Sequence, residues 1–187
     1  MLQGNPLVPR QIFFTTGVGV HLDKLASFEM ALRDARIARY NLVTISSILP
    51  PHCEFVEREE GVERLQAGEI VFCVLSKASS NEPGVHLGAS VGVAVPRDRS
   101  MYGYISEHHT SGPSVDAVAE YAEDLAAQML ATALGAPFDP EVAWDERKEH
   151  WRLSGHVVES RSYAMVAEVP EQGTWVTRPE RMASRVG

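Results

Sequence analysis

Residues 41–51 read Asn-Leu-Val-Thr-Ile-Ser-Ser-Ile-Leu-Pro-Pro, and the rest of the chain is organised around this stretch. Its first five residues are mostly apolar and predict a short strand, with Ser46 and Ser47 at the end of that strand. The two closing prolines cannot donate to a β-ladder, so regular pairing has to stop there. Such a junction can hold a peptide bond in a conformation that costs of order 1–3 kcal/mol elsewhere.

Two regular elements are predicted before this stretch. Residues 11–21 (QIFFTTGVGVH) are typical of a strand that runs into a glycine-punctuated turn. Asp23 belongs to a residue type that caps helices, and the apolar spacing after it predicts a helix over residues 24–39.

Three further strands are predicted after it. Residues 69–79 and 85–95 are rich in apolar residues and flank a turn at residues 81–84, so we expect a hairpin. Apolar residues alternate with small or polar ones over 85–95, which is typical of a half-buried strand. Residues 101–109 predict the third strand.

A long helix and a final strand complete the predicted fold. The helix covers residues 115–134 and ends at Gly135, and one strand or a pair of strands is expected over residues 152–169. Residues 171–187 are polar and aperiodic and are expected to form a loosely held C-terminal tail. The fold class is therefore α+β, with one domain over residues 1–170, mostly antiparallel strands and helices on the outer face.

Composition and charge narrow the class of protein. A chain of 187 residues fits one domain, and its formal charge of -8 argues against nucleic acid, which needs a basic surface. An acidic balance suits a cationic small molecule. No apolar run approaches the ~20 residues of a membrane span, and the first ten residues lack signal-peptide features, so we expect no membrane partner and a cytoplasmic location.

The cysteines and histidines follow no disulfide or metal pattern. Cys53 and Cys73 are too few for a disulfide framework and are expected as small buried residues. His108 and His109 follow Glu107, but adjacent strand side chains point to opposite faces and cannot easily share one ion. No metal site is predicted.

The run NLVTISSILPP resembles the self-processing site of the pyruvoyl-dependent arginine decarboxylases. Residues 27–32 (SFEMAL) resemble the first-helix segment of that family, and residues 103–107 (GYISE) resemble the strand that bears its catalytic acid. The resemblance covers residues 13–134 well. It implies a layered α/β/β/α sandwich with mostly antiparallel sheets, assembled as a homo-oligomer, either a trimer or two stacked trimers.

The resemblance also implies that the chain makes its own cofactor. Ser47 Oγ would attack the Ser46 carbonyl carbon and replace the amide by an ester, with Asn41 as the expected donor to the oxyanion, a contribution of ~3 kcal/mol. β-Elimination would release a chain that ends at Ser46, and hydrolysis would convert residue 47 to a covalent pyruvoyl group. The substrate α-amine would then form a Schiff base with the ketone and lose CO2.

Three more residue roles come from the same resemblance. Glu107 is the expected proton donor to the carbon that loses CO2, so it must hold a proton at neutral pH. Glu29 and Ser46 are the expected substrate contacts; where this chain has Glu29, the family has an aspartate that pairs with the guanidinium of arginine. Arginine is the favoured substrate and agmatine the product, and another cationic amino acid stays open as the alternative.

Each of these residues also has a plain structural interpretation. Asn41 could cap the turn after the helix, Glu29 could lie on the solvated face of its helix, and Glu107 could be an exposed strand residue. For the whole chain, the alternative is an unprocessed homologue that keeps the fold as a binding or assembly subunit. The chemical state of residue 47 distinguishes this homologue from an enzyme.

Overall fold

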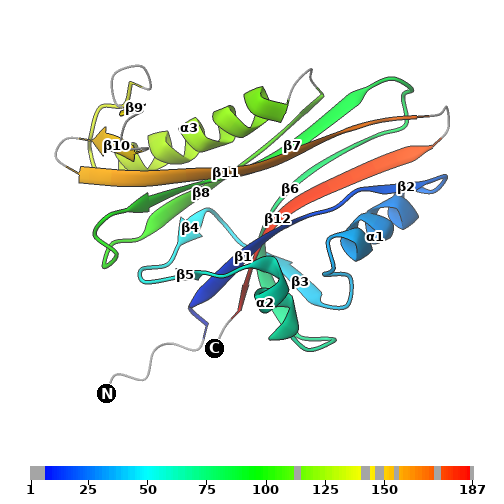
Figure 1. Ribbon diagram of the computed structural model, residues 1–187, viewed down its shortest axis with the longest axis horizontal. Coiled ribbons are helices and arrows are strands. Elements are labelled where there is room, and N and C mark those ends of the chain that lie inside the picture. The colour runs from blue at the N-terminus through cyan, green and yellow to red at the C-terminus, as the bar shows by residue number, and fades with distance from the viewer. Residues whose placement is uncertain are drawn as a thin grey trace.

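The computed structural model describes residues 7–111, 115–139, 144–145, 150–153, 156–170 and 174–185. Within these ranges the chain forms two six-stranded sheets that pack face to face, with helices on both outer faces (Figure 1). The layers are therefore α/β/β/α, as predicted, and the fold class is confirmed.

The first sheet combines five strands from residues 11–80 with the last described strand of the chain. Its strands are β1 (Gln11–Thr16), β2 (Gly19–His21), β3 (Asn41–Thr44), β5 (Glu54–Phe55), β6 (Ile70–Ser80) and β12 (Trp175–Arg185). They lie in the order β3-β6-β12-β1-β5, and β2 pairs with β12. The pairs β3–β6 and β1–β5 are parallel, and the others are antiparallel.

The second sheet is antiparallel throughout the described pairs. Its strands are β4 (Ile48–Leu49), β7 (His86–Pro96), β8 (Gly103–Ser111), β9 (Trp144–Asp145), β10 (His150–Leu153) and β11 (His156–Glu168), in the order β4-β8-β7-β11-β10-β9. The helices α1 (Lys24–Asp34) and α2 (Arg58–Glu63) pack on the first sheet, and α3 (Val115–Ala133) packs on the second.

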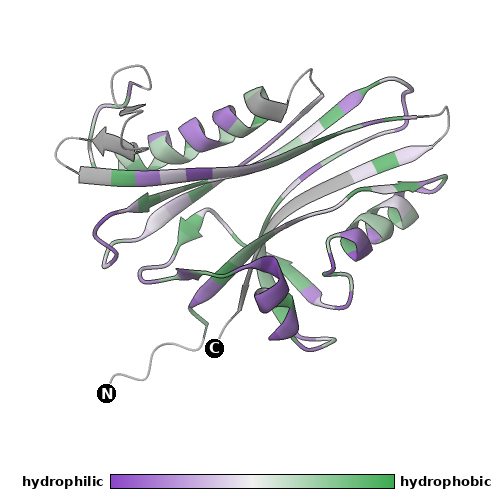
Figure 2. Cartoon of the chain, viewed as in Figure 1, coloured by the Kyte–Doolittle hydropathy of each residue, from purple (hydrophilic) through white to green (hydrophobic). Residues whose placement is uncertain are grey.

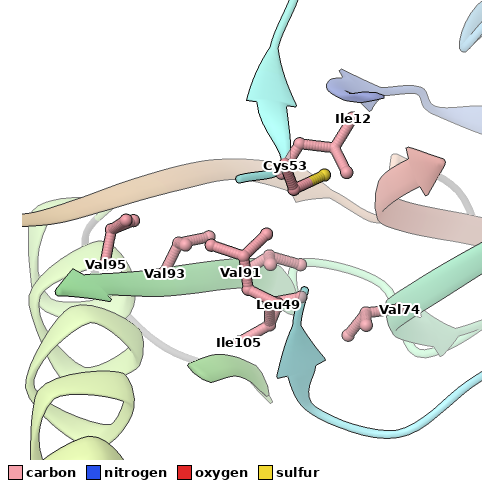
Figure 3. Packing of buried hydrophobic residues seen from close by; sticks show 8 residues of the cluster. All are labelled: Ile12, Leu49, Cys53, Val74, Val91, Val93, Val95 and Ile105. Carbon is pink, nitrogen blue, oxygen red and sulfur yellow. The ribbon is translucent and has the colours of Figure 1, made fainter. Parts of the chain in front are cut away.

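Three of the four hydrophobic cores in the described part of the chain lie around the sheets and helices that position the site. The core between the sheets contains Ile12, Leu49, Cys53, Val74, Val91, Val93, Val95 and Ile105 (Figure 3). The core beneath α1 and α2 contains Phe13, Leu32, Ala35, Ile37, Tyr40, Val62, Leu65 and Val71. The third contains Ala94, Ala126, Ala127, Leu130, Ala131, Ala136 and Val158 and lies beneath α3, whose surface alternates between hydrophilic and hydrophobic residues in Figure 2. Successive residues of β1 serve different cores because side chains alternate along a strand.

The predicted hairpin of residues 69–79 and 85–95 is wrong. The two strands exist, but β6 pairs with β3 and β12 while β7 pairs with β8 and β11. The turn between them, with Gly84 at φ 74°, carries the chain from the first sheet to the second. β7 is also buried after its first residue, because the first sheet covers one of its faces and α3 covers the other. A half-buried strand was therefore also the wrong expectation.

The start of α1 was predicted correctly and its end was not. Asp23 caps the helix, and its carboxylate accepts a hydrogen bond from the Ala26 N–H at 2.9 Å. The helix ends at Asp34 rather than at residue 39 because Arg36 takes a left-handed conformation, with φ 62°. The Ile37 N–H then donates to the Leu32 carbonyl at 2.9 Å, which closes the helix in a Schellman motif.

The segment expected to be a loosely held tail, residues 171–187, contains β12. This strand lies in the middle of the first sheet, between β1 and β6. Its register runs from Arg185 opposite Gln11 to Val176 opposite Ser80. Pro179 and several charged residues interrupt the alternation that marks a strand, so the sequence pattern concealed it.

Candidate active site

The Ser46–Ser47 peptide bond lies where the chain crosses from one sheet to the other. β3 is the edge strand of the first sheet, and the Ile45 N–H still donates to the Cys73 carbonyl at 2.9 Å. Three residues later, at Ile48, the chain enters β4, which is the edge strand of the second sheet (Figure 1). The predicted cleavage bond therefore joins two sheet edges and belongs to neither ladder.

The structure holds the segment after this bond firmly. The Ser47 carbonyl accepts a hydrogen bond from the Ile105 N–H of β8 at 2.7 Å. Leu49 is only 2% exposed and packs between the sheets with Val91 and Ile105 (Figure 3). Ser46 is exposed and Ser47 is half-buried, so one side of the bond faces solvent while the other is fixed to the core.

The paired prolines end β4 after two residues, as the sequence predicts. Beyond them His52 takes a left-handed conformation, with φ 58°, and its N–H donates to the Arg99 carbonyl at 2.9 Å. The Cys53 N–H reaches back to the Pro50 carbonyl at 3.3 Å. Because prolines lack an N–H, the ladder with β8 cannot continue past Leu49.

Glu107 lies on the strand that holds Ser47. β8 places Ile105 opposite Ser47 through the hydrogen bond just described, and Glu107 follows two residues later on the same face of the strand. That face is directed toward the first sheet, since Ile105 belongs to the core between the sheets. Ser106 points the other way, and its hydroxyl donates to the Ala122 carbonyl of α3. Glu107 itself is exposed.

A hydrogen bond next to Glu107 connects the two sheets. Ser76 of β6 is 1% exposed, and its hydroxyl donates to the His108 carbonyl at 2.5 Å. The His108 ring lies on the other face of β8, 4.3 Å from the Tyr121 ring. Burial lowers the pKa of His108, and the charge of His109 lowers it further. The His108 ring therefore packs against α3 as part of the scaffold at this point.

Asn41 and Glu29 are not brought to Ser47 within this chain. Asn41 begins β3, and its side-chain amide donates to the Gly68 carbonyl at 2.6 Å. Ser46 follows it five positions later along mostly extended chain, a span of roughly 16 Å. The Asn41 side chain therefore does not reach the Ser46 carbonyl within one chain, and its expected role as oxyanion donor stays a prediction.

Glu29 belongs to α1, a helix that lies away from β4 (Figure 1). Ser27 is fully buried, and its hydroxyl lies 2.6 Å from that of Thr177 of β12, so this side of α1 faces the sheet. Glu29 is 46% exposed on another side and accepts a hydrogen bond from Arg33 Nε at 3.0 Å. Within one chain it is a half-exposed carboxylate paired with its helical neighbour.

The sequence predicts roles for Ser46, Ser47 and Glu107, and the structure places the two serines just before β4, beside the strand β8 that carries Glu107. The sequence did not indicate the backbone N–H groups of Ile48 and Ile105, which hold the carbonyls of Ser46 and Ser47. Every residue other than proline carries an N–H, so no side-chain pattern could have indicated them. Within the described part of the chain, no three His, Cys, Asp or Glu side chains are grouped to hold a metal, and no helix is long and apolar enough to cross a membrane.

A four-layer sandwich with a Ser-Ser bond between its sheet edges and a carboxylate on the adjoining strand defines the class of self-processing decarboxylases. The family model described as pyruvoyl-dependent arginine decarboxylase matches residues 11–178. The chain is 51% identical over 171 residues to pyruvoyl-dependent arginine decarboxylase 2 of Methanosarcina mazei, covering 91% of this chain and 93% of that protein. It is 52% identical over 170 residues to the probable pyruvoyl-dependent arginine decarboxylase of Chloroherpeton thalassium, with the same coverage. The chain belongs to the pyruvoyl-dependent arginine decarboxylase family.

Proposed function

We propose that this chain cuts itself between Ser46 and Ser47, converts Ser47 to a covalent pyruvoyl group and decarboxylates L-arginine to agmatine and CO2. The observation that carries the proposal is the Ser46–Ser47 bond, exposed on its Ser46 side and held on its Ser47 side by the 2.7 Å bond from the Ile105 N–H. The names of the relatives indicate that the substrate is arginine.

The residues around Ser47 fit a pyruvoyl group. The ketone and methyl carbons of the group would derive from Cα and Cβ of residue 47, whose own carbonyl is already fixed to β8. Ser46 is exposed, so the carboxylate formed there can enter solvent. Once formed, the group supplies the electrophilic ketone that amino-acid decarboxylation needs. Leu49 and Ile105 are both in the core, so we expect them to hold residue 47 in the same position after the cut.

Glu107 has the role of proton donor in this proposal. It lies on the face of β8 shared with Ile105, two residues or roughly 7 Å along the strand from the point that holds Ser47. A carboxylic acid at this position can deliver a proton to a substrate bound beside residue 47. Ser76 and its bond to the His108 carbonyl support this position by tying β8 to β6.

Glu29 and Asn41 contribute to substrate binding and processing only if a second copy of the chain presents them to Ser47. We therefore propose a homo-oligomer, a trimer or two stacked trimers, with its active sites between copies. Support comes from the separation of α1 from β4 and from exposed apolar side chains near α1, namely Val20, Leu22, Leu25 and Met30. The carboxylate of Glu29 then pairs with the substrate guanidinium.

Intact-mass measurement and denaturing electrophoresis of incubated protein test the proposal. We expect two fragments, residues 1–46 and 47–187, with the second beginning in a pyruvoyl group. Release of CO2 is then measured with arginine, ornithine and lysine, and native mass gives the number of copies. A single full-length species after incubation refutes self-processing, and a cleaved protein that prefers ornithine or lysine refutes arginine as the substrate.

We place the activity in the cytoplasm, since the buried Cys53 thiol, which forms no disulfide, suits a reducing compartment.

A further inference from the structure

The carbonyl group that self-cleavage has to attack already has a hydrogen-bond donor. The Ser46 carbonyl oxygen accepts a bond from the Ile48 N–H at 3.0 Å, which closes a three-residue turn around Ser47. Among the described non-glycine residues only Arg36 and His52 have positive φ, so this is a turn of the inverse γ type, which is common where strands begin and end.

This donor is fixed before any reaction begins. Ile48 pairs with Tyr104 of β8, and the next residue, Leu49, is 2% exposed in the core between the sheets. The Ser47 carbonyl is held in addition by the Ile105 N–H. A donor that is already oriented stabilises a developing oxyanion without the cost of reorganisation.

We propose that the Ile48 backbone N–H is the oxyanion donor of self-cleavage. This inference rests on the proposed function, because it concerns the attack of Ser47 Oγ on the Ser46 carbonyl carbon. In that attack the new O–C bond forms, the carbonyl π-electron pair moves to the Ser46 oxygen, and the N–H of Ile48 binds that oxygen. The oxygen then returns its electron pair, the C–N bond breaks, and the proton lost by the hydroxyl ends on the Ser47 nitrogen, which leaves an ester and a free amine.

The structure favours this N–H over the Asn41 side chain within one chain. Asn41 lies at the opposite end of β3, and its amide already donates to the Gly68 carbonyl at 2.6 Å. The Ile48 N–H is two residues from the oxygen and is bonded to it in the uncleaved chain. A substitution of Asn41 therefore changes the start of β3, whereas loss of the Ile48 N–H changes the reacting carbonyl directly.

An amide-to-ester replacement at position 48 tests the inference, because it removes the N–H and keeps the isoleucine side chain. The full chain is assembled with this ester, with an ester at Val56, or with ordinary amides throughout. The Val56 ester is the matched control, because it removes a bond of 2.9 Å to the Ile12 carbonyl outside the cleavage site. We expect the Val56 ester chain to form the fragment that ends at Ser46 at the all-amide rate, and the position-48 ester chain to form it about 100-fold more slowly.

A second measurement distinguishes loss of the hydrogen bond from an effect of the ester on folding. In Ser47→Ala chains, which cannot cleave, the isotope-labelled Ser46 carbonyl should absorb at higher infrared frequency with the ester at position 48 than with the amide. Equal cleavage rates for the ester and amide chains, or an unchanged carbonyl frequency in folded protein, overturn the role of Ile48 alone. Failure of the all-amide chain to cleave overturns self-processing itself, and this inference with it.

Discussion

Replacing Leu49 by alanine tests whether the core fixes the cleavage site. β4 has only two residues, and Leu49 is the one that enters the core between the sheets, where it is 2% exposed. Truncating a leucine this deeply buried typically costs 2–5 kcal/mol, and we expect about 3 kcal/mol here. For a chain of this length that corresponds to a lowering of Tm by roughly 6–12 °C.

The same substitution should slow self-cleavage. Without Leu49, β4 loses its attachment to the core, and Ser47 is held mainly by the 2.7 Å bond from the Ile105 N–H. We expect a cleavage rate about tenfold lower, equivalent to about 1.4 kcal/mol of lost positioning. Urea unfolding, followed by circular dichroism in a Ser47→Ala background, gives the stability of uncleaved protein. Electrophoresis of freshly made protein over time gives the cleavage rate.

Leu7→Ala is the matched control, because it makes the same chemical change at a side chain that is 69% exposed. We expect it to change the free energy of unfolding by less than about 0.5 kcal/mol and to leave cleavage unchanged. Equal stability losses in the two variants would contradict the burial argument. A destabilised Leu49→Ala protein that still cleaves at the wild-type rate would show that the buried Leu49 side chain does not position Ser47.

Three further predictions follow from the site and its surroundings. Ser47→Ala should remain a single full-length species without activity, and a cut at this position by intact mass would disprove the assignment of the nucleophile. Glu107→Gln should cleave normally and lose most CO2 release from arginine, whereas wild-type turnover would remove Glu107 from the mechanism. Burial, with a smaller effect of the Glu54 charge, raises the pKa of the Cys53 thiol to about 12 from its ordinary value of 9.0. The neutral thiol therefore adds stability below about pH 9 that is lost as the pH rises toward 12. The free energy of unfolding, measured with urea from about pH 8 to about pH 11, should decline more steeply for the parent protein than for Cys53→Ala.

Local signals in the sequence predicted local structure well. Asp23 capped its helix and Gly135 ended another, since a cap depends on a few neighbouring residues. The choice of sheet for each strand was not predictable in this way. β6 and β7 are neighbours in sequence and read as a hairpin, yet each finds its partners elsewhere, and β12 is a central strand despite Pro179. Pairing partners are decided by long-range packing, which a single sequence does not display.

In the candidate site, too, the sequence predicts some groups and not others. Ser46, Ser47 and Glu107 could be named because their side chains have distinctive chemistry and spacing. The N–H groups of Ile48 and Ile105 could not, because they belong to the backbone and depend on the way β4 meets β8. Their importance appears only when the two strands are placed side by side.

The position of the Ser46–Ser47 bond explains how a chain can be cut within its fold. Residues 1–46 contain β1, which pairs along its whole length with β12, and β3, which pairs with β6. They also bury Ile12 between the sheets and Phe13 beneath the helices, so packing holds them to residues 47–187 after the bond is broken. A cut inside β6 or β12 would interrupt ladders on both sides, whereas this bond joins two edge strands and takes part in neither ladder. The connection between the sheets is thus the part of the chain that can become a cofactor with little loss of folded structure.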